Sequence, residues 1–308
     1  MSRWELNAAR IGDNSLRASY TLCRRLNAAH GKTYYLATLL LPPAKRPHVH
    51  ALYGFARYAD EIVDDLDTNP SEAIRADRLA AFTARVSTDL AAGHSAHPIV
   101  RALIHTMGTW EIPPGYVESF LASMRMDLTI AGYATYDALM EYVYGSAEVV
   151  GLQMLPILEH PGIPREQAEP FARNLGVGFQ LANFIRDVGE DLRRGRVYLP
   201  QEDLDSFGVE RSRLARGVVD APIRRLLRFE IDRARSVLDA ARPGIELLHP
   251  ASRDCVRTAF VLYGGILGEI ERRDYQVLTQ RVSVGTPRRA AVALPALVRA
   301  CLARTRFS

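Results

Sequence analysis

QLANFIRDVGEDLRRGRVYLP, residues 180–200, carries two interleaved patterns that decide the fold. Its apolar residues recur every three or four positions: Leu181, Phe184, Ile185 and Val188. This spacing predicts a helix with one face in a core. Its oxygen-bearing residues follow a second stripe: Gln180, Asn183, Asp187 and Asp191. Acids at intervals of four share a helix face and repel one another, so the stripe indicates a cation nearby. Glu190 points elsewhere and is expected at the surface.

A second acidic stripe lies in YGFARYADEIVDD, residues 53–65. Asp60 and Asp64 are four apart, and Tyr53 and Arg57 precede them on the same helix face. Such a pair alone is common on solvated helices. Two stripes on two mostly apolar helices instead favour a cavity that holds a metal between them.

The pattern also indicates the kind of metal and ligand. Carboxylates suit Mg²⁺, usually one or two per ion, and phosphate oxygens and water complete its octahedron. The ligand that such a cluster serves is most simply a diphosphate. Lys32, Arg57 and Arg186 are candidate partners for its charge. The competing interpretation is two unrelated pairs of surface acids.

The rest of the chain has a helical pattern between breaks rich in proline and glycine. Residues 71–92 place apolar side chains three to five positions apart after a Ser71 cap, and residues 223–242 repeat this pattern before Pro243. Alternating β-branched runs and internal repeats are absent. We expect one all-α domain over residues 1–308, built from about ten helices.

Composition excludes several classes of protein. The chain has 308 residues, of which 48% are hydrophobic and 24% charged, as in globular proteins. A net charge of +4 does not indicate a nucleic-acid partner, and basic clusters such as Arg193–Arg196 are expected on solvated faces or on an anion-binding surface. No uncharged apolar run reaches the ~18 residues of a membrane-spanning helix, and no secretory signal sequence is evident. The three cysteines are too widely spaced for a zinc or redox motif. We expect a cytoplasmic protein.

The two acidic motifs resemble those of the squalene/phytoene synthase family, the head-to-head prenyl synthases. DEIVD at residues 60–64 resembles the family's first aspartate-rich motif, and DVGEDLRRGRVYLP at 187–200 resembles the second. HGKTYYLA at 30–37, YVYGSAEVVG at 142–151 and FVLYGGILGEIERRDY around Tyr263 extend the resemblance over nearly the whole chain. Two positions depart from the family pattern. Gly31 stands where the family often has Ser, and Glu148 stands where it often has Gly or Ala.

The resemblance implies a helical isoprenoid-synthase fold with a central cavity and a set of site residues. The implied ligands of Mg²⁺, or of Mn²⁺ in its place, are Asp60, Asp64, Asn183, Asp187 and Asp191. The implied catalytic residues are Asp60, Asp64, Asp187, Asp191, Tyr142, Arg57 and Arg186. The implied contacts of the diphosphate or the prenyl chain are His30, Gly31, Lys32, Thr33, Tyr53, Arg57, Gln180, Arg186, Tyr198, Tyr263 and Arg281.

The activity implied is the head-to-head condensation of two geranylgeranyl diphosphates to phytoene through a cyclopropyl diphosphate, in carotenoid biosynthesis. The alternative is the same chemistry on farnesyl diphosphate, giving squalene or dehydrosqualene. A third hypothesis is a non-catalytic relative of the family. No nicotinamide or flavin site is expected, because Gly176-Val-Gly178 does not fit the dinucleotide fingerprint. That segment and Gly264–Gly268 are interpreted as close helix packing.

Two further expectations concern chain length and the membrane. The small Ala37 and Thr38 follow Tyr34 on a helix expected to line the cavity, which favours C20 substrates. Residues 287–307 are basic and partly amphipathic, broken at Pro295, and could lie at an anionic membrane surface as a peripheral contact. The alternative is a last helix packed on the domain with its arginines in water.

Overall fold

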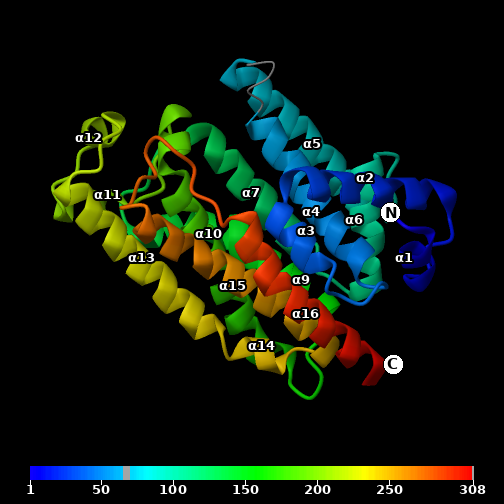
Figure 1. Ribbon diagram of the computed structural model, residues 1–308. Helices are drawn as coiled ribbons and strands as arrows, with labels where there is room; N and C mark the ends of the chain where they lie inside the picture. Colours follow the sequence, from blue (N-terminus) through cyan, green and yellow to red (C-terminus); the bar gives the residue numbers. More distant parts are fainter. Residues whose placement is uncertain (65–69, 307–308) are drawn as a thin grey trace.

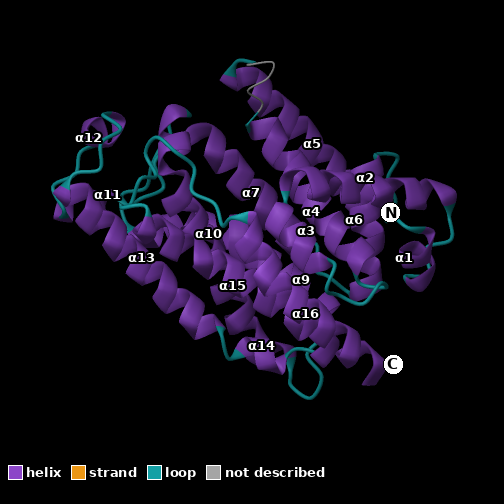
Figure 2. Ribbon diagram, viewed as in Figure 1, coloured by secondary structure: helices purple, strands orange, loops and turns teal. Residues whose placement is uncertain are grey.

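Helices build this fold throughout. The computed structural model describes residues 1–64 and 70–306, with side chains to residue 303. Within those ranges the only β-type pairing is an isolated parallel bridge between Gly132 and Val197, and no strand forms (Figure 2). The all-α prediction is therefore confirmed.

The helices follow one another through short turns. In chain order they are α1 (Arg3–Ala8), α2 (Asn14–His30), α3 (Lys32–Thr38), α4 (Arg46–Val63), α5 (Glu72–Ala92), α6 (Pro98–Trp110), α7 (Gly115–Thr129), α8 (Tyr136–Val143), the π-helical turn η1 (Tyr144–Glu148), α9 (Val149–Leu158), α10 (Arg165–Arg193), α11 (Gln201–Ser206), α12 (Arg211–Ala215), α13 (Ala221–Ala241), α14 (Gly244–Leu247), α15 (Pro250–Arg272) and α16 (Thr286–Arg306).

The predicted number of about ten helices is too low, because the described residues form sixteen α-helical segments. Several of the extra segments span only four to six residues, too short to leave a periodic apolar stripe in the sequence. The two helices predicted in detail are present. Ser71 caps α5 by accepting a hydrogen bond from the Ile74 amide, and α13 ends just before Pro243.

The central helix α10 brings distant parts of the chain together (Figure 1). It packs against α13 and α15 on one side and against α9 and η1 on the other, while α4 packs with α2, α6 and α7. The first acidic motif lies at the end of α4, and the second lies in the last turns of α10. The fold thus brings the ends of α4 and α10, which are more than 100 residues apart in sequence, close enough for Asp64 to pair with Arg194.

The buried apolar side chains of the described residues form one cluster that runs from Leu6 to Ala300. The expected close packing at Gly176 is confirmed, because a Cβ there would lie 2.4 Å from the Ala147 carbonyl oxygen of η1. At Gly264 and Gly268 the expectation is wrong: no atom lies within 4 Å of a Cβ built on either residue.

The final helix also departs from expectation. Pro295 lies inside α16 and does not end it, although an internal proline costs a helix about 3 kcal/mol. α16 packs against α15, and Ala293 and Ala296, on either side of the proline, are buried. No helix in the described part of the chain is long and apolar enough to span a bilayer.

Candidate active site

The first acidic motif lies at the carboxyl end of α4. Asp60 is in its last turn and Asp64 is its C-cap residue. Arg57, one turn earlier, donates to Asp60 over 2.8 Å and to Glu61 over 3.0 Å. Burial and the Asp64 charge both raise the pKa of Asp60. Since 41% of its side-chain surface still faces solvent, water limits that rise.

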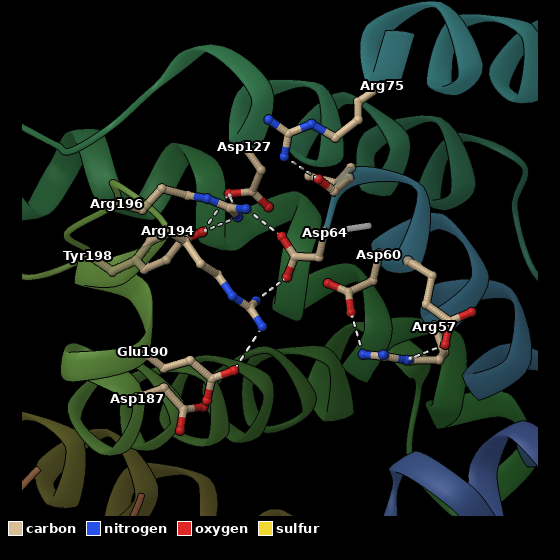
Figure 3. Close-up of polar contacts among 12 residues, drawn as sticks. Arg57, Asp60, Asp64, Arg75, Asp127, Asp187, Glu190, Arg194, Arg196 and Tyr198 are labelled. Carbon is tan, nitrogen blue, oxygen red and sulfur yellow. Dashed lines mark hydrogen bonds and ion pairs between the residues drawn. The ribbon is translucent and has the colours of Figure 1, made fainter. Parts of the chain in front are cut away.

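Asp64 connects the two motifs. Its two carboxylate oxygens each form an ion pair with an arginine just beyond the end of α10, Arg194 on one oxygen and Arg196 on the other (Figure 3). Arg194 also donates to Glu190 over 2.8 Å. The sequence left a solvated face or an anion-binding surface open for these arginines; both are largely buried and span the gap between α4 and α10. Glu190, expected at the surface, is half-buried and helps to hold this bridge.

Asp187 is the most heavily paired carboxylate of the second motif. Arg186 donates to it over 2.8 Å, and Arg281, from the loop after α15, donates over 2.9 Å. Asp191, one turn further along α10, has no such pairing to offset its burial, which together with the Asp187 charge raises its pKa to about 7.

Arg281 reaches Asp187 because the loop that carries it lies directly on α10. Gly189, in the middle of the second motif, allows this approach, since a Cβ there would lie 2.0 Å from the Leu278 carbonyl oxygen. Arg281, which is predicted to contact the diphosphate, thus lies at the second acidic motif. The motif needs its glycine because a main-chain segment passes over that point.

The unpaired carbonyl of Asn183 is the clearest indication of a cation. Asn183 lies one turn before Asp187 on α10, and its Oδ1 is buried without a hydrogen-bond partner. Such a group costs about 1–3 kcal/mol if nothing binds it. A diphosphate oxygen cannot donate a hydrogen bond, whereas a metal ion can bind a carbonyl oxygen. The donor set therefore fits Mg²⁺.

The protein does not form a complete metal cage by itself. Across residues 1–64 and 70–306, no three His, Cys, Asp or Glu side chains lie close enough together to enclose an ion. Mg²⁺ usually takes one or two carboxylates from a protein and completes its shell with water and substrate phosphates. The arginines that now pair with Asp64 and Asp187 are equally suited to phosphate oxygens.

Asp127 on α7 lies at the centre of a buried hydrogen-bond network. It accepts hydrogen bonds from Tyr142 over 2.8 Å and from Tyr198 over 2.7 Å, and Arg196 lies 3.7 Å away. Burial raises its pKa to about 6, against the opposing effects of Arg196 and the two phenols. Both predicted tyrosines thus orient around Asp127, which also holds the arginine that binds Asp64.

An apolar cavity of about 340 Å³ leads away from the acidic motifs into the centre of the fold. Gln180, Asn183 and Tyr53, all predicted site residues, line it. Its other walls come from α3, α4, η1, α9, α10 and α15, with Ala37, Thr38, Leu52, Phe55, Ala147, Val150, Met154, Phe171, Leu175, Phe179, Val256 and Ala259 among them. Thr38 therefore faces the cavity, as the chain-length argument requires.

The predicted tyrosine of α15 lies at the wall of this cavity. The ring of Tyr263 stacks on Phe179 at 4.3 Å between centroids, and it lies 5.1 Å from the ring of Tyr34. Both of these neighbours line the cavity. Tyr263 is fully buried, and the charge of Arg186 beside it opposes the rise in its pKa that burial causes.

The segment His30–Thr33, predicted to contact diphosphate, forms the junction of α2 and α3. His30 lies 3.5 Å from Glu61, so the junction faces the first acidic motif. Gly31 has little room for a side chain as its neighbours now lie: a Cβ there would be 2.6 Å from Asn27 Oδ1 and 2.7 Å from the ring of Tyr53. Lys32 is exposed and Thr33 is half-buried.

Comparison with known proteins agrees with this site. The sequence model described as squalene/phytoene synthase matches residues 27–288. The chain is 39% identical to a phytoene synthase of Arthrospira platensis, covering 87% of this chain and 89% of that protein. It is 38% identical to a 15-cis-phytoene synthase of a Synechocystis species, covering 89% of this chain and 83% of that protein.

Solved structures give the same answer at the level of the fold. A dehydrosqualene synthase bound to a ligand superposes with a TM-score of 0.83 at 25% identity, covering 91% of this chain and 96% of that one. A squalene synthase of Alicyclobacillus acidocaldarius superposes with a TM-score of 0.76 at 27% identity, covering 87% and 99%. With its two acidic motifs facing each other at an apolar cavity, the chain belongs to the squalene/phytoene synthase family.

Proposed function

We propose that the protein is a phytoene synthase, a prenyltransferase that joins two geranylgeranyl diphosphates head to head in carotenoid biosynthesis. The observation that carries the proposal is the pair of oxygen-bearing stripes on α4 and α10 that meet at the mouth of an apolar cavity. Its relatives in cyanobacteria and plants, 34–39% identical over most of this chain, are named phytoene synthases.

The reaction begins with loss of diphosphate from one substrate. Asp60, Asp64, Asn183, Asp187 and Asp191 are the residues that would hold Mg²⁺. Bound there, Mg²⁺ supplies Lewis-acid stabilisation of the negative charge that develops on the leaving diphosphate. Arg57, Arg186 and Arg281 face the same cleft from three different elements and can donate charge-assisted hydrogen bonds to that diphosphate.

The allylic cation left behind must meet the second prenyl chain before water does. The apolar walls of the cavity exclude water and hold both chains in place. The double bond of the second chain attacks the cation, a proton is lost, and a cyclopropyl diphosphate forms. Loss of its diphosphate, rearrangement and loss of a further proton give phytoene, so the two half-reactions of one turnover together release two diphosphates and two protons.

The same site supports one alternative substrate. The two solved structures described above are named dehydrosqualene synthase and squalene synthase, and these names favour farnesyl diphosphate as the substrate. The small Thr38 at the cavity wall favours the longer C20 chain instead. Incubation of the pure protein with each diphosphate and Mg²⁺, followed by mass spectrometry of the hydrocarbon, separates the two. A product from farnesyl diphosphate alone would overturn the phytoene assignment.

We also propose that the protein works on the inner face of a membrane from the cytoplasm. A C40 hydrocarbon is insoluble in water and has to pass from the cavity into a lipid phase. Because no described helix can span a bilayer, this contact would be peripheral. Activity recovered with the membrane fraction at low salt and released at high salt would support it, and activity that never sediments with membranes would contradict it.

A further inference from the structure

Helix α16 buries small side chains and exposes large ones. Ala293, Ala296 and Ala300, three to four positions apart, are buried among the helices beneath. The outer face of α16 consists instead of exposed apolar side chains: Leu294 (63%), Leu297 (41%), Val298 (62%) and Leu302 (57%), together with the exposed Cys301. A surface helix normally turns its large apolar residues inward.

The outer face of α16 forms a continuous stripe. Its positions follow the series i, i+3, i+4, i+7 and i+8, which places them on one side of a helix. Four of the ten large apolar side chains that are exposed in the described part of the chain belong to this one helix. Such a concentration of apolar surface marks a contact with a partner or a membrane.

The charge of α16 distinguishes between a protein partner and a membrane. Residues 286–306 contain five arginines and no acidic residue. Arg299 is paired with Asp254 of α15 over 2.9 Å and so fixes α16 to its support, while Arg288 is exposed. Two copies of this helix would bring two positively charged segments together, with no acidic residue on either to offset the charge. An anionic bilayer offers both the negative charge and the apolar interior that such a helix requires.

We propose that the outer face of α16 docks on an anionic lipid bilayer and lies in the plane of its interface. This inference rests on the proposed function, because a hydrocarbon product is the reason for a membrane contact. It adds which surface of the protein makes that contact. On α15, Val256 and Ala259 line the prenyl cavity, whereas Asp254 binds α16. Docking therefore brings the cavity to within about one helix diameter, ~10 Å, of the lipid. A long hydrocarbon then leaves by a short path.

Vesicle co-sedimentation of the full chain tests the proposal without any substrate. The double variant Leu294→Glu/Val298→Glu adds two charges to the stripe. The matched control Ile74→Glu/Val218→Glu adds the same charge at exposed apolar positions on α5 and in the loop before α13. On phosphatidylglycerol/phosphatidylcholine vesicles the α16 variant should bind at least tenfold more weakly than the control. Equal binding by the two variants would overturn the proposal.

Cys301 provides a second readout at a native residue. It is the exposed thiol of the stripe, whereas Cys23 and Cys255 are buried and burial raises the pKa of each to about 12, so maleimide reacts first with Cys301. Anionic vesicles should slow its alkylation severalfold, and pure phosphatidylcholine should not. An unchanged alkylation rate with bound vesicles would place the contact on another surface and refute the assignment.

Two controls separate this proposal from its competitors. If light scattering shows a dimer that Leu294→Glu/Val298→Glu dissociates, and the protein does not bind vesicles, the occupant is a second copy and the proposal fails. In detergent micelles the same variant should form product at the normal rate. Loss of all product by every form of the protein, with vesicle binding intact, would refute the proposed enzyme function and leave the docking surface standing.

Discussion

Substitution of Gly189 by alanine tests how the second motif is assembled. A Cβ at this position would lie 2.0 Å from the Leu278 oxygen and 2.5 Å from its carbonyl carbon. The loop after α15 would have to retreat by about 1.4 Å before ordinary van der Waals contact is restored, since interiors are close-packed. That loop carries Arg281, whose guanidinium would move away from Asp187.

The expected magnitudes follow from this displacement. Overpacking costs about 1–3 kcal/mol, of which alanine recovers roughly 0.5–1 kcal/mol as a better helix former than glycine. The net loss of about 1–2 kcal/mol should lower the Tm by a few degrees. A shift of about 1 Å in a group that positions substrate can reduce the rate by up to ~10²-fold. We therefore expect a modest loss of stability and a large loss of kcat/KM.

Gly264→Ala is the matched control, because α15 has open space around that glycine. It should leave the Tm unchanged or slightly raised, with normal kcat/KM. Thermal melts give the difference in Tm between the two variants, and steady-state rates give the difference in kcat/KM. If Gly189→Ala melts and turns over like Gly264→Ala, the close approach does not constrain the site and the reasoning is wrong.

Three further substitutions probe other parts of the site. Asp60→Asn should lower turnover by at least ~10²-fold while the circular dichroism spectrum and Tm stay near normal, because a metal-binding carboxylate is lost and the fold is not; full activity in this variant would remove Asp60 from the metal site. Thr38→Phe should shift the product from C40 toward C30 hydrocarbons by filling the cavity wall, and an unchanged product ratio on mass spectrometry would refute the volume argument. Asp127→Asn should raise the Mg²⁺ concentration needed for half-maximal rate by about 10–100-fold, because Asp127 positions Arg196 and through it Asp64; a Mg²⁺ titration that matches the unmodified protein would reduce Asp127 to a structural role.

The parts of the site that lie within helices could be predicted from the sequence. The helical period fixes which side chains share a face, so the stripes on α4 and α10 were identified before their distance was known. The small residues Ala37 and Thr38 were placed on the cavity wall by the same reasoning, and the structure confirms it. Resemblance to the family supplied roles for tyrosines that no spacing rule could assign.

Contacts outside helical periodicity could not be predicted. Arg194 and Arg196 lie beyond the end of α10, where no repeat fixes the direction of a side chain, and a run of arginines usually lies in water. Asp127 meets Tyr198 across 71 residues of sequence, a separation at which the helical period carries no information about contacts.

The central claim is that one site, built from both acidic motifs, condenses two C20 diphosphates in a metal-dependent reaction. The most direct measurement is a competition in which the pure protein receives equimolar geranylgeranyl and farnesyl diphosphate with Mg²⁺ in detergent, and all hydrocarbons are identified by mass spectrometry. The account predicts phytoene as the main product, and none when a chelator is in excess or when Asp187→Asn replaces the unmodified protein. A C30 hydrocarbon as the main product, or phytoene formed equally well in the presence of the chelator, would contradict it.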